Sequence, residues 1–179
     1  MTGFQSRSKQ NTEWGSNQDQ NETPRYLLVF DTEAIHDSRF PRPEEGARLK
    51  PATMQVVAIS YLLARIETVD GRERFRVEHC RSGGKPGDGE KALLSGFWSM
   101  MDAKMPRLVS WGGRKFDMPM LKARSMGHRL SAGRVFKAGD KWANYNQRFS
   151  SGWHCDLMDV MSEYGAATFT SLDEMSQII

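Results

Sequence analysis

Cysteine and long apolar runs are the scarcest features of this sequence of 179 residues. The two cysteines, Cys80 and Cys155, lie far apart and form no CxxC motif, so we expect neither a disulfide scaffold nor a zinc ribbon. Each follows a histidine, but adjacent ligands rarely suit a tetrahedral zinc site. No apolar segment approaches the roughly 20 residues of a membrane-spanning helix, and the chain begins without a signal-peptide pattern. We therefore expect a cytoplasmic protein that does not bind membranes.

Apolar residues are also rare at the start of the chain, which is rich in Gln, Asn, Ser and Thr. Such a segment cannot bury enough surface to become ordered, so we predict a disordered tail over residues 1–24. The hydrophobic content of 39% is enough for one ordinary core in a chain of this length. We therefore predict one folded domain over residues 25–179.

The pattern of the remaining residues favours the α/β class, with a mixed sheet flanked by helices. Asp70-Gly71 suits a two-residue hairpin turn between an apolar strand and a third strand. Asp88 suits a helix N-cap. The expected strands cover 25–30, 54–67, the residues after Gly71, and 106–111; the expected helices cover 89–104 and 119–126.

Acidic residues are scarce from Lys104 to Arg148, where eleven Lys and Arg accompany two acids. From Phe149 to Ile179 the sequence has five acids and no Lys or Arg. Aromatic residues interleave with the basic ones, a combination that holds a phosphate backbone and stacks bases. A solvated surface with aromatic side chains in the core would give the same composition. The aromatic residues are Trp111, Phe116, Phe136, Trp142, Tyr145 and Phe149.

Two carboxylates follow the first apolar run in "YLLVFDTEAI". We expect the first strand to end at Asp31 and Glu33, whose side chains point to one face because residues i and i+2 of a strand do so. The two charges repel unless a cation neutralises them, and hard oxygen ligands suit Mg²⁺ or Mn²⁺. The alternative is a solvated turn that carries two acids.

A third carboxylate, Asp117, occurs in "SWGGRKFDMPML". A strand followed by a Gly-Gly turn would deliver Asp117 to the end of a neighbouring strand, and Phe116 would pack inward to fix the entry to a helix. Asp117 could instead be a simple N-cap.

These motifs resemble those of the DEDD 3′-5′ exonucleases with a ribonuclease H-like fold, specifically predicted exonucleases related to the proofreading domain of B-family DNA polymerases. "FDTE" is similar to the first motif and "GGRKFDMPML" to the second, except that Gly112 stands where the family usually has Asn. The resemblance implies that Asp31, Glu33 and Asp117 are catalytic and bind two Mg²⁺ or Mn²⁺ ions. It also implies hydrolysis at the 3′ end of single-stranded DNA or RNA, and a role in DNA repair.

The family's third motif, Tyr-x-x-x-Asp, does not occur in the sequence. We therefore expect a fold that is incomplete at its C-terminus, a natural protein that continues beyond Ile179 or a shortened gene product, and weak or absent activity. His154 and Asp159 offer an alternative third motif, although the acids near 156–159 better suit the first turn of a helix. Ser171 and Glu174 form a capping box for a last helix.

Two other functions compete with exonuclease activity. One is a catalytically silent module that binds nucleic acid. The other is a haloacid dehalogenase-type phosphatase, which also places an Asp after its first strand. An exonuclease and a silent nucleic-acid-binding module would both contact nucleic acid through basic and aromatic residues around Asp117. These residues are Arg114, Lys115, Phe116, Lys122, Arg124 and Trp142.

Overall fold

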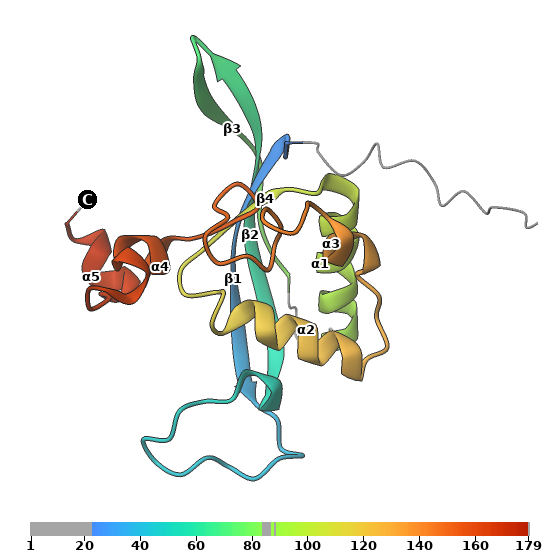
Figure 1. Ribbon diagram of the computed structural model, residues 1–179. Coiled ribbons are helices and arrows are strands. Elements are labelled where there is room, and N and C mark those ends of the chain that lie inside the picture. The colour runs from blue at the N-terminus through green and yellow to red at the C-terminus, as the bar shows by residue number, and fades with distance from the viewer. Residues whose placement is uncertain (1–22, 84–86, 88, 179) are drawn as a thin grey trace, which may run out of the picture.

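The computed structural model describes residues 23–83, 87 and 89–178. The predicted tail over residues 1–24 and the predicted cap at Asp88 lie almost wholly outside this range. The structure confirms the α/β class, with one five-stranded mixed sheet and helices packed against it (Figure 1). The elements are β1 (Tyr26–His36), η2 (Pro51–Thr53), β2 (Met54–Val69), β3 (Arg72–Gly83), α1 (Glu90–Lys104), β4 (Arg107–Ser110), α2 (Asp117–Gly127), α3 (Gly133–Lys137), β5 (His154–Asp156), α4 (Leu157–Met161), η3 (Glu163–Gly165) and α5 (Leu172–Ser176).

The strand order of the sheet is β3-β2-β1-β4-β5. β1 is central; it pairs antiparallel with β2 and parallel with β4, and β4 pairs parallel with β5. The sequence did not predict β5, because three residues are too few to show an alternating pattern. β1 was expected to end at its two acids, but it continues to His36.

The core lies between one face of the sheet and helices α1 and α2. Alternate residues of β1, Leu28 and Phe30, point into this core, where Leu94 of α1 and Leu121 of α2 are also buried. The two helices close one side of the sheet, whereas α4 and α5 lie on its other side in Figure 1. Phe116 packs against the core from the entry to α2, as predicted.

The β2–β3 hairpin turns at Asp70 and Gly71, as the sequence predicts. Both residues have positive φ, 52° and 72°, which is the conformation that a two-residue hairpin turn of type I′ requires. The hairpin extends beyond the other strands at the top of Figure 1.

The capping box at Ser171 and Glu174 is also present, and it begins α5. None of the helices that the structure describes has the length and apolar character that a bilayer crossing requires.

Candidate active site

Asp31 and Glu33 lie inside β1, which corrects the expectation that the strand ends on them. Both side chains are exposed on one face of the strand, opposite the face that buries Phe30 and Thr32. β4 pairs with β1 only from Leu27 to Val29, so the two acids follow the point where this pairing stops. A register shift between Glu33 and Ala34 then interrupts the pairing with β2. The two acids therefore occupy a section of β1 with one free edge.

Asp117, the first residue of α2, reaches this free edge of β1. Its Oδ1 accepts a hydrogen bond of 3.1 Å from the backbone N–H of Thr32 and a second bond from the Thr32 hydroxyl. Thr32 lies between Asp31 and Glu33 in the sequence. The fold thus brings the third predicted carboxylate to the strand segment that carries the other two.

The charge on Asp117 is unfavourable in this position. Burial raises its pKa, the Thr32 hydrogen bond opposes that rise, and the negative charge of Asp31 raises the pKa further. Oxygen ligands with excess negative charge are the donors that Mg²⁺ and Mn²⁺ prefer, so the residues present fit a divalent cation. Among the described residues, however, no group of three or more His, Cys, Asp or Glu is already gathered around one point. Side-chain rearrangement would therefore have to accompany metal binding by all three acids.

The loop before α2 requires two glycines for different reasons. Gly112 has φ of +72°, in the left-handed region. Asn also tolerates that region well, which gives a physical reason why Gly and Asn can exchange at this place. A Cβ on Gly113 would lie 2.6 Å from the Cβ of Ser110, so only glycine fits there without a shift of β4.

Asp156 fixes the same loop from β5. Its two carboxylate oxygens accept hydrogen bonds from the backbone N–H groups of Gly112, at 2.7 Å, and Arg114, at 2.9 Å. Sequence reasoning assigned Asp156 to the first turn of a helix and missed this role, since the loop and β5 lie far apart in the chain. Asp156 is the N-cap residue of α4, but its side chain makes no capping bond.

His154 and Asp159, the alternative third motif, are occupied by other partners. The His154 ring is 1% exposed, and its Nε2 lies 2.9 Å from the Ser110 hydroxyl. Burial, with the nearby positive charge of Arg114, lowers the pKa of His154 to about 3. Asp159 accepts hydrogen bonds from both Nε and Nη2 of Arg148, at 2.6 and 2.5 Å. The pair therefore does not join the carboxylates of β1.

The two His-Cys dipeptides lie on β3 and β5, at opposite edges of the sheet, and cannot form one zinc site. Cys80 and Cys155 are free thiols.

A groove of about 350 Å³ lies beside Asp31 on the face of the sheet that α1 and α2 do not cover. It is mostly apolar, and its walls come from the sheet and from α4 and α5. Its lining includes Val29, Asp31, Leu62, Trp111, Leu157 and Leu172. Another cavity, of about 310 Å³, lies between α1 and the β2–β3 pair and is lined by apolar side chains such as Leu93 and Phe97. Only the first of these two cavities contains a candidate catalytic group.

Two of the residues predicted to bind nucleic acid are exposed. The indole of Trp142 is 75% exposed, and the Lys141 ammonium lies 4.7 Å from its ring centre. Lys115, on the loop before Asp117, is exposed, with its ammonium 5.3 Å from the ring centre of Phe169.

The other basic residues of that set face the protein. Arg114 is half-buried and donates hydrogen bonds to the carbonyls of Tyr145, at 3.3 Å, and His154, at 2.6 Å. Lys122 donates to the Asn146 amide oxygen at 2.6 Å, and burial lowers the pKa of its ammonium. Arg124 is 7% exposed and bonds to buried carboxylates. In this structure, these three side chains serve internal contacts.

Comparison with protein families gives a match over residues 48–179 to the model described as "Predicted 3'-5' exonuclease related to the exonuclease domain of PolB". The matched range contains Asp117 and begins after Asp31 and Glu33. A sequence comparison with curated proteins finds no match.

Two solved structures have similar folds. The family B DNA polymerase from the hyperthermophilic archaeon Pyrobaculum calidifontis is 19% identical, with a TM-score of 0.54 over 87% of this chain and 18% of the polymerase. Exonuclease I in complex with the inhibitor BCBP is 11% identical, with a TM-score of 0.50 over 81% of this chain and 31% of that chain. The chain thus spans less than a third of either protein. At these identities the likeness shows the fold, which is ribonuclease H-like.

Proposed function

Because the chain belongs to the family of predicted 3′-5′ exonucleases related to the exonuclease domain of PolB, we propose that it is a metal-dependent exonuclease-like domain that acts on the 3′ end of single-stranded nucleic acid. The observation that carries this proposal is the position of Asp117, which is buried, bonded to Thr32 and destabilised by the charge of Asp31. A carboxyl group with a raised pKa is typical of catalytic sites, and the neighbouring acid, Asp31, lines a groove.

Asp31, Glu33 and Asp117 would hold the divalent cations, Mg²⁺ or Mn²⁺. When bound, such ions would supply activation of a water molecule and stabilisation of the leaving oxygen in phosphodiester hydrolysis. The surrounding residues of the chain position the carboxylates. Thr32 holds Asp117 against β1, and Asp156 holds the loop from which α2 begins.

The groove beside Asp31 supports a nucleotide as the substrate. Its apolar lining, with Trp111 at the end of β4, suits the face of a base, and stacking of a base on an aromatic ring contributes about 1–3 kcal/mol. Lys115 and Trp142 are exposed, so they are the residues of the predicted set that we propose for contact with the phosphate backbone and for stacking of further bases. DNA is the first substrate to test, in view of the family's relation to a DNA polymerase, and DNA repair is the setting we propose.

The test is hydrolysis of a single-stranded DNA that carries a label away from its 3′ end, with Mn²⁺. We expect slow, stepwise shortening from the 3′ end that stops in Asp31→Asn and in Asp117→Asn. The rate should be low because the sequence has no Tyr-x-x-x-Asp, and losing one metal ligand should cost more than the 10- to 100-fold that follows loss of a supporting residue. Cleavage that persists in both variants would refute the assignment.

A catalytically silent nucleic-acid-binding module is the second candidate, favoured because the described carboxylates are not already gathered around one point. It predicts salt-sensitive binding of single-stranded DNA without cleavage at any Mn²⁺ concentration. For either candidate, Lys115→Ala should lower the slope of log affinity against log salt by up to about 1. The phosphatase alternative receives no support from the family match.

A further inference from the structure

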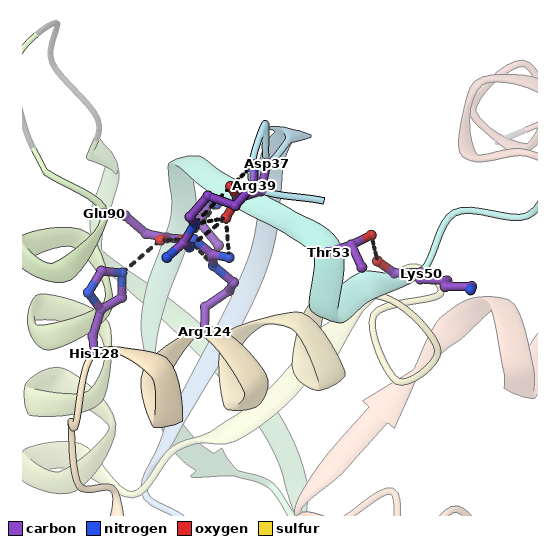
Figure 2. A network of polar contacts seen from close by, with 8 residues as sticks. Asp37, Arg39, Lys50, Thr53, Glu90, Arg124 and His128 are labelled. Carbon is purple, nitrogen blue, oxygen red and sulfur yellow. Dashed lines mark hydrogen bonds and ion pairs between the residues drawn. The ribbon is translucent and has the colours of Figure 1, made fainter. Parts of the chain in front are cut away.

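A buried network of charged residues connects the far end of α2 to three other elements (Figure 2). At its centre is Arg124, whose Nε and Nη2 donate to the two oxygens of Glu90, at 2.7 and 2.5 Å. Its Nη1 donates to Oδ2 of Asp37 at 2.6 Å. The exposed fractions of Asp37, Glu90 and Arg124 are 3%, 6% and 7%. The guanidinium is therefore shared by two buried carboxylates.

Each carboxylate belongs to a different part of the fold. Asp37 directly follows β1 and also accepts hydrogen bonds from the exposed side chain of Arg39. Glu90 begins α1, and its Oε1 accepts the backbone N–H of Val56 in β2 at 2.8 Å. The His128 ring, just after α2, lies 2.7 Å from Oε2 of Glu90. Arg124 thus joins α2 directly to Asp37 and to α1, and through Glu90 to β2.

α2 is attached at two places to the segment formed by β1 and the residue that follows it, Asp37. Near its start, Asp117 accepts the backbone N–H and hydroxyl of Thr32; two turns later, about 10.5 Å along the helix axis, Arg124 bonds to Asp37. Apolar packing also holds α2, with Met120 and Leu121 fully buried, but apolar contacts are less directional than hydrogen bonds. Two attachments fix both its rotation and its position along β1, and so the distance between Asp117 and the side chains of Asp31 and Glu33.

Stability alone is a weak reason for this network. Apolar residues of similar shape often stabilise a fold as well as a buried ion pair does, because burying the charges costs free energy. The guanidinium provides something that an apolar residue lacks, since its planar fork fixes the angle as well as the distance of the groups that it joins.

We propose that Arg124 is a positioning residue for the candidate metal site, which sets α2 against β1 so that Asp31, Glu33 and Asp117 can share divalent cations. The inference rests on the proposed function for the metal, while the placement of α2 can be measured without any metal. The proposed role of Arg124 is to hold the helix, without contact to the cation or the substrate.

Two variants separate positioning from general stability. Asp37→Asn weakens the bond between α2 and the end of β1, together with the exposed pair that Asp37 makes with Arg39. Arg124→Lys keeps the charge but loses the fork. Glu90→Gln perturbs the attachment to α1 and β2 instead. The matched control is Arg107→Lys, since Arg107 makes a two-bond contact with Glu73, at 2.6 and 2.8 Å, on β4 and away from α2.

The first measurement is Mn²⁺ affinity by titration calorimetry at a temperature where circular dichroism shows every variant to be folded. We expect Asp37→Asn and Arg124→Lys to weaken Mn²⁺ binding by about 10-fold or more, as the loss of residues that support metal ligands commonly does. Arg107→Lys should bind as the wild type does, and Glu90→Gln should lose less affinity than Asp37→Asn. Affinities in Asp37→Asn and Arg124→Lys equal to that of the control would overturn the proposal.

The second measurement is hydrogen exchange of the Thr32 amide by NMR, without metal. That N–H donates to Asp117, so a displaced α2 should raise its exchange rate at least 10-fold in Asp37→Asn and Arg124→Lys, relative to other core amides, and leave it unchanged in Arg107→Lys. Unchanged protection in both variants would refute positioning even if the wild type binds no Mn²⁺. A third outcome is that the wild type binds no Mn²⁺ while exchange of the Thr32 amide rises in the two variants as expected. That outcome would refute the metal site and keep the positioning role.

Discussion

The two ends of α2 hold carboxylates in opposite electrostatic situations. At its far end, Asp37 and Glu90 share the guanidinium of Arg124. At its start, Asp117 meets the charge of Asp31 and has a neutral threonine as its bonded partner. Glu90 and Asp117 are both 6% exposed, so burial does not distinguish them.

The pKa values of these two buried acids shift in opposite directions. Burial would raise the pKa of Glu90, but hydrogen bonds from Arg124 and His128 outweigh it and lower the pKa. For Asp117, burial and the charge of Asp31 together raise the pKa. The comparison teaches that this fold supplies a positive charge where carboxylates are structural, and leaves negative charge in excess where we propose that a cation binds.

Removal of the guanidinium should have the largest effect. Arg124→Met leaves Glu90 buried without a guanidinium partner and Asp37 with Arg39 alone, and breaking a buried pair in this way costs about 3–5 kcal/mol. Urea denaturation measures the loss in free energy of unfolding. Arg76→Met is the control, because both side chains of its pair with Glu67 are exposed, and such a pair contributes about 1 kcal/mol or below. Equal losses of stability in the two variants would show that the buried network of Arg124 stabilises the fold no more than an exposed ion pair does.

The loop that delivers Asp117 should be the next most sensitive place. Gly113→Ala forces a Cβ against Ser110 and should cost about 1–3 kcal/mol, as overpacking commonly does. Gly112→Asn should cost less, because Asn accepts positive φ, although the side chain of Met158 must shift slightly. Thermal unfolding of the two variants checks the order, and a Gly112→Asn protein less stable than Gly113→Ala would contradict it.

Neutralising an acid should change the free energy of unfolding in opposite directions at the two ends of α2. Asp117→Asn and Asp31→Asn remove like-charge repulsion, so the metal-free proteins should be as stable as the wild type or more stable, by on the order of 1 kcal/mol, a typical size for single substitutions. Glu90→Gln should destabilise. In addition, Mn²⁺ should raise the melting temperature of the wild type and of Glu90→Gln, but not of the two Asn variants. If Asp117→Asn destabilises the metal-free protein, the Asp117 carboxylate has a structural role and the contrast between the two ends of α2 is wrong.

Lowering the pH should give the smallest difference in stability between the wild type and a variant. Hydrogen bonds from Arg39, and then from Arg124, lower the pKa of Asp37, and bonds from Arg124 and His128 lower the pKa of Glu90 against the effect of burial. The contribution of the two acids to stability is therefore fully present above their unfolded values, near 4, and is lost as pH falls through the folded values. Melting temperatures between neutral pH and pH 3 should therefore fall more steeply for the wild type than for Arg124→Met. Parallel curves would show that the guanidinium does not lower these pKa values.

Much of the fold could be predicted from local patterns. The apolar runs located β1, β2 and β4, Asp70-Gly71 located the hairpin, and "GEKALLSGFWSMMDAK" matched α1 closely. Three-residue β5 has no such pattern. The apolar run also stopped before β1 did, because hydrogen bonds with β2 continue through Asp31 and Glu33 after the apolar residues end.

The candidate site could be predicted only as far as its own residues. Asp31, Glu33 and Asp117 stand in short motifs, and their role as metal ligands stays a prediction. The contacts that hold them could not be predicted: Asp37, Glu90 and Arg124 come from three distant segments and meet only after folding. The sequence around Arg124 gives no sign that its side chain is buried. It was therefore predicted to bind a phosphate, as an exposed basic residue near Asp117 would.

The projecting β2–β3 hairpin has a practical consequence for attaching the molecule to a probe. Its tip, Asp70-Gly71, is exposed, and it lies at the end of the sheet opposite the loop that follows β1 in Figure 1. Exposed turns accept inserted residues, and each doubling of a flexible loop's length costs only about 0.6 kcal/mol. A fluorophore or an immobilisation tag placed at this turn would leave both ends of α2 unobstructed for single-molecule work.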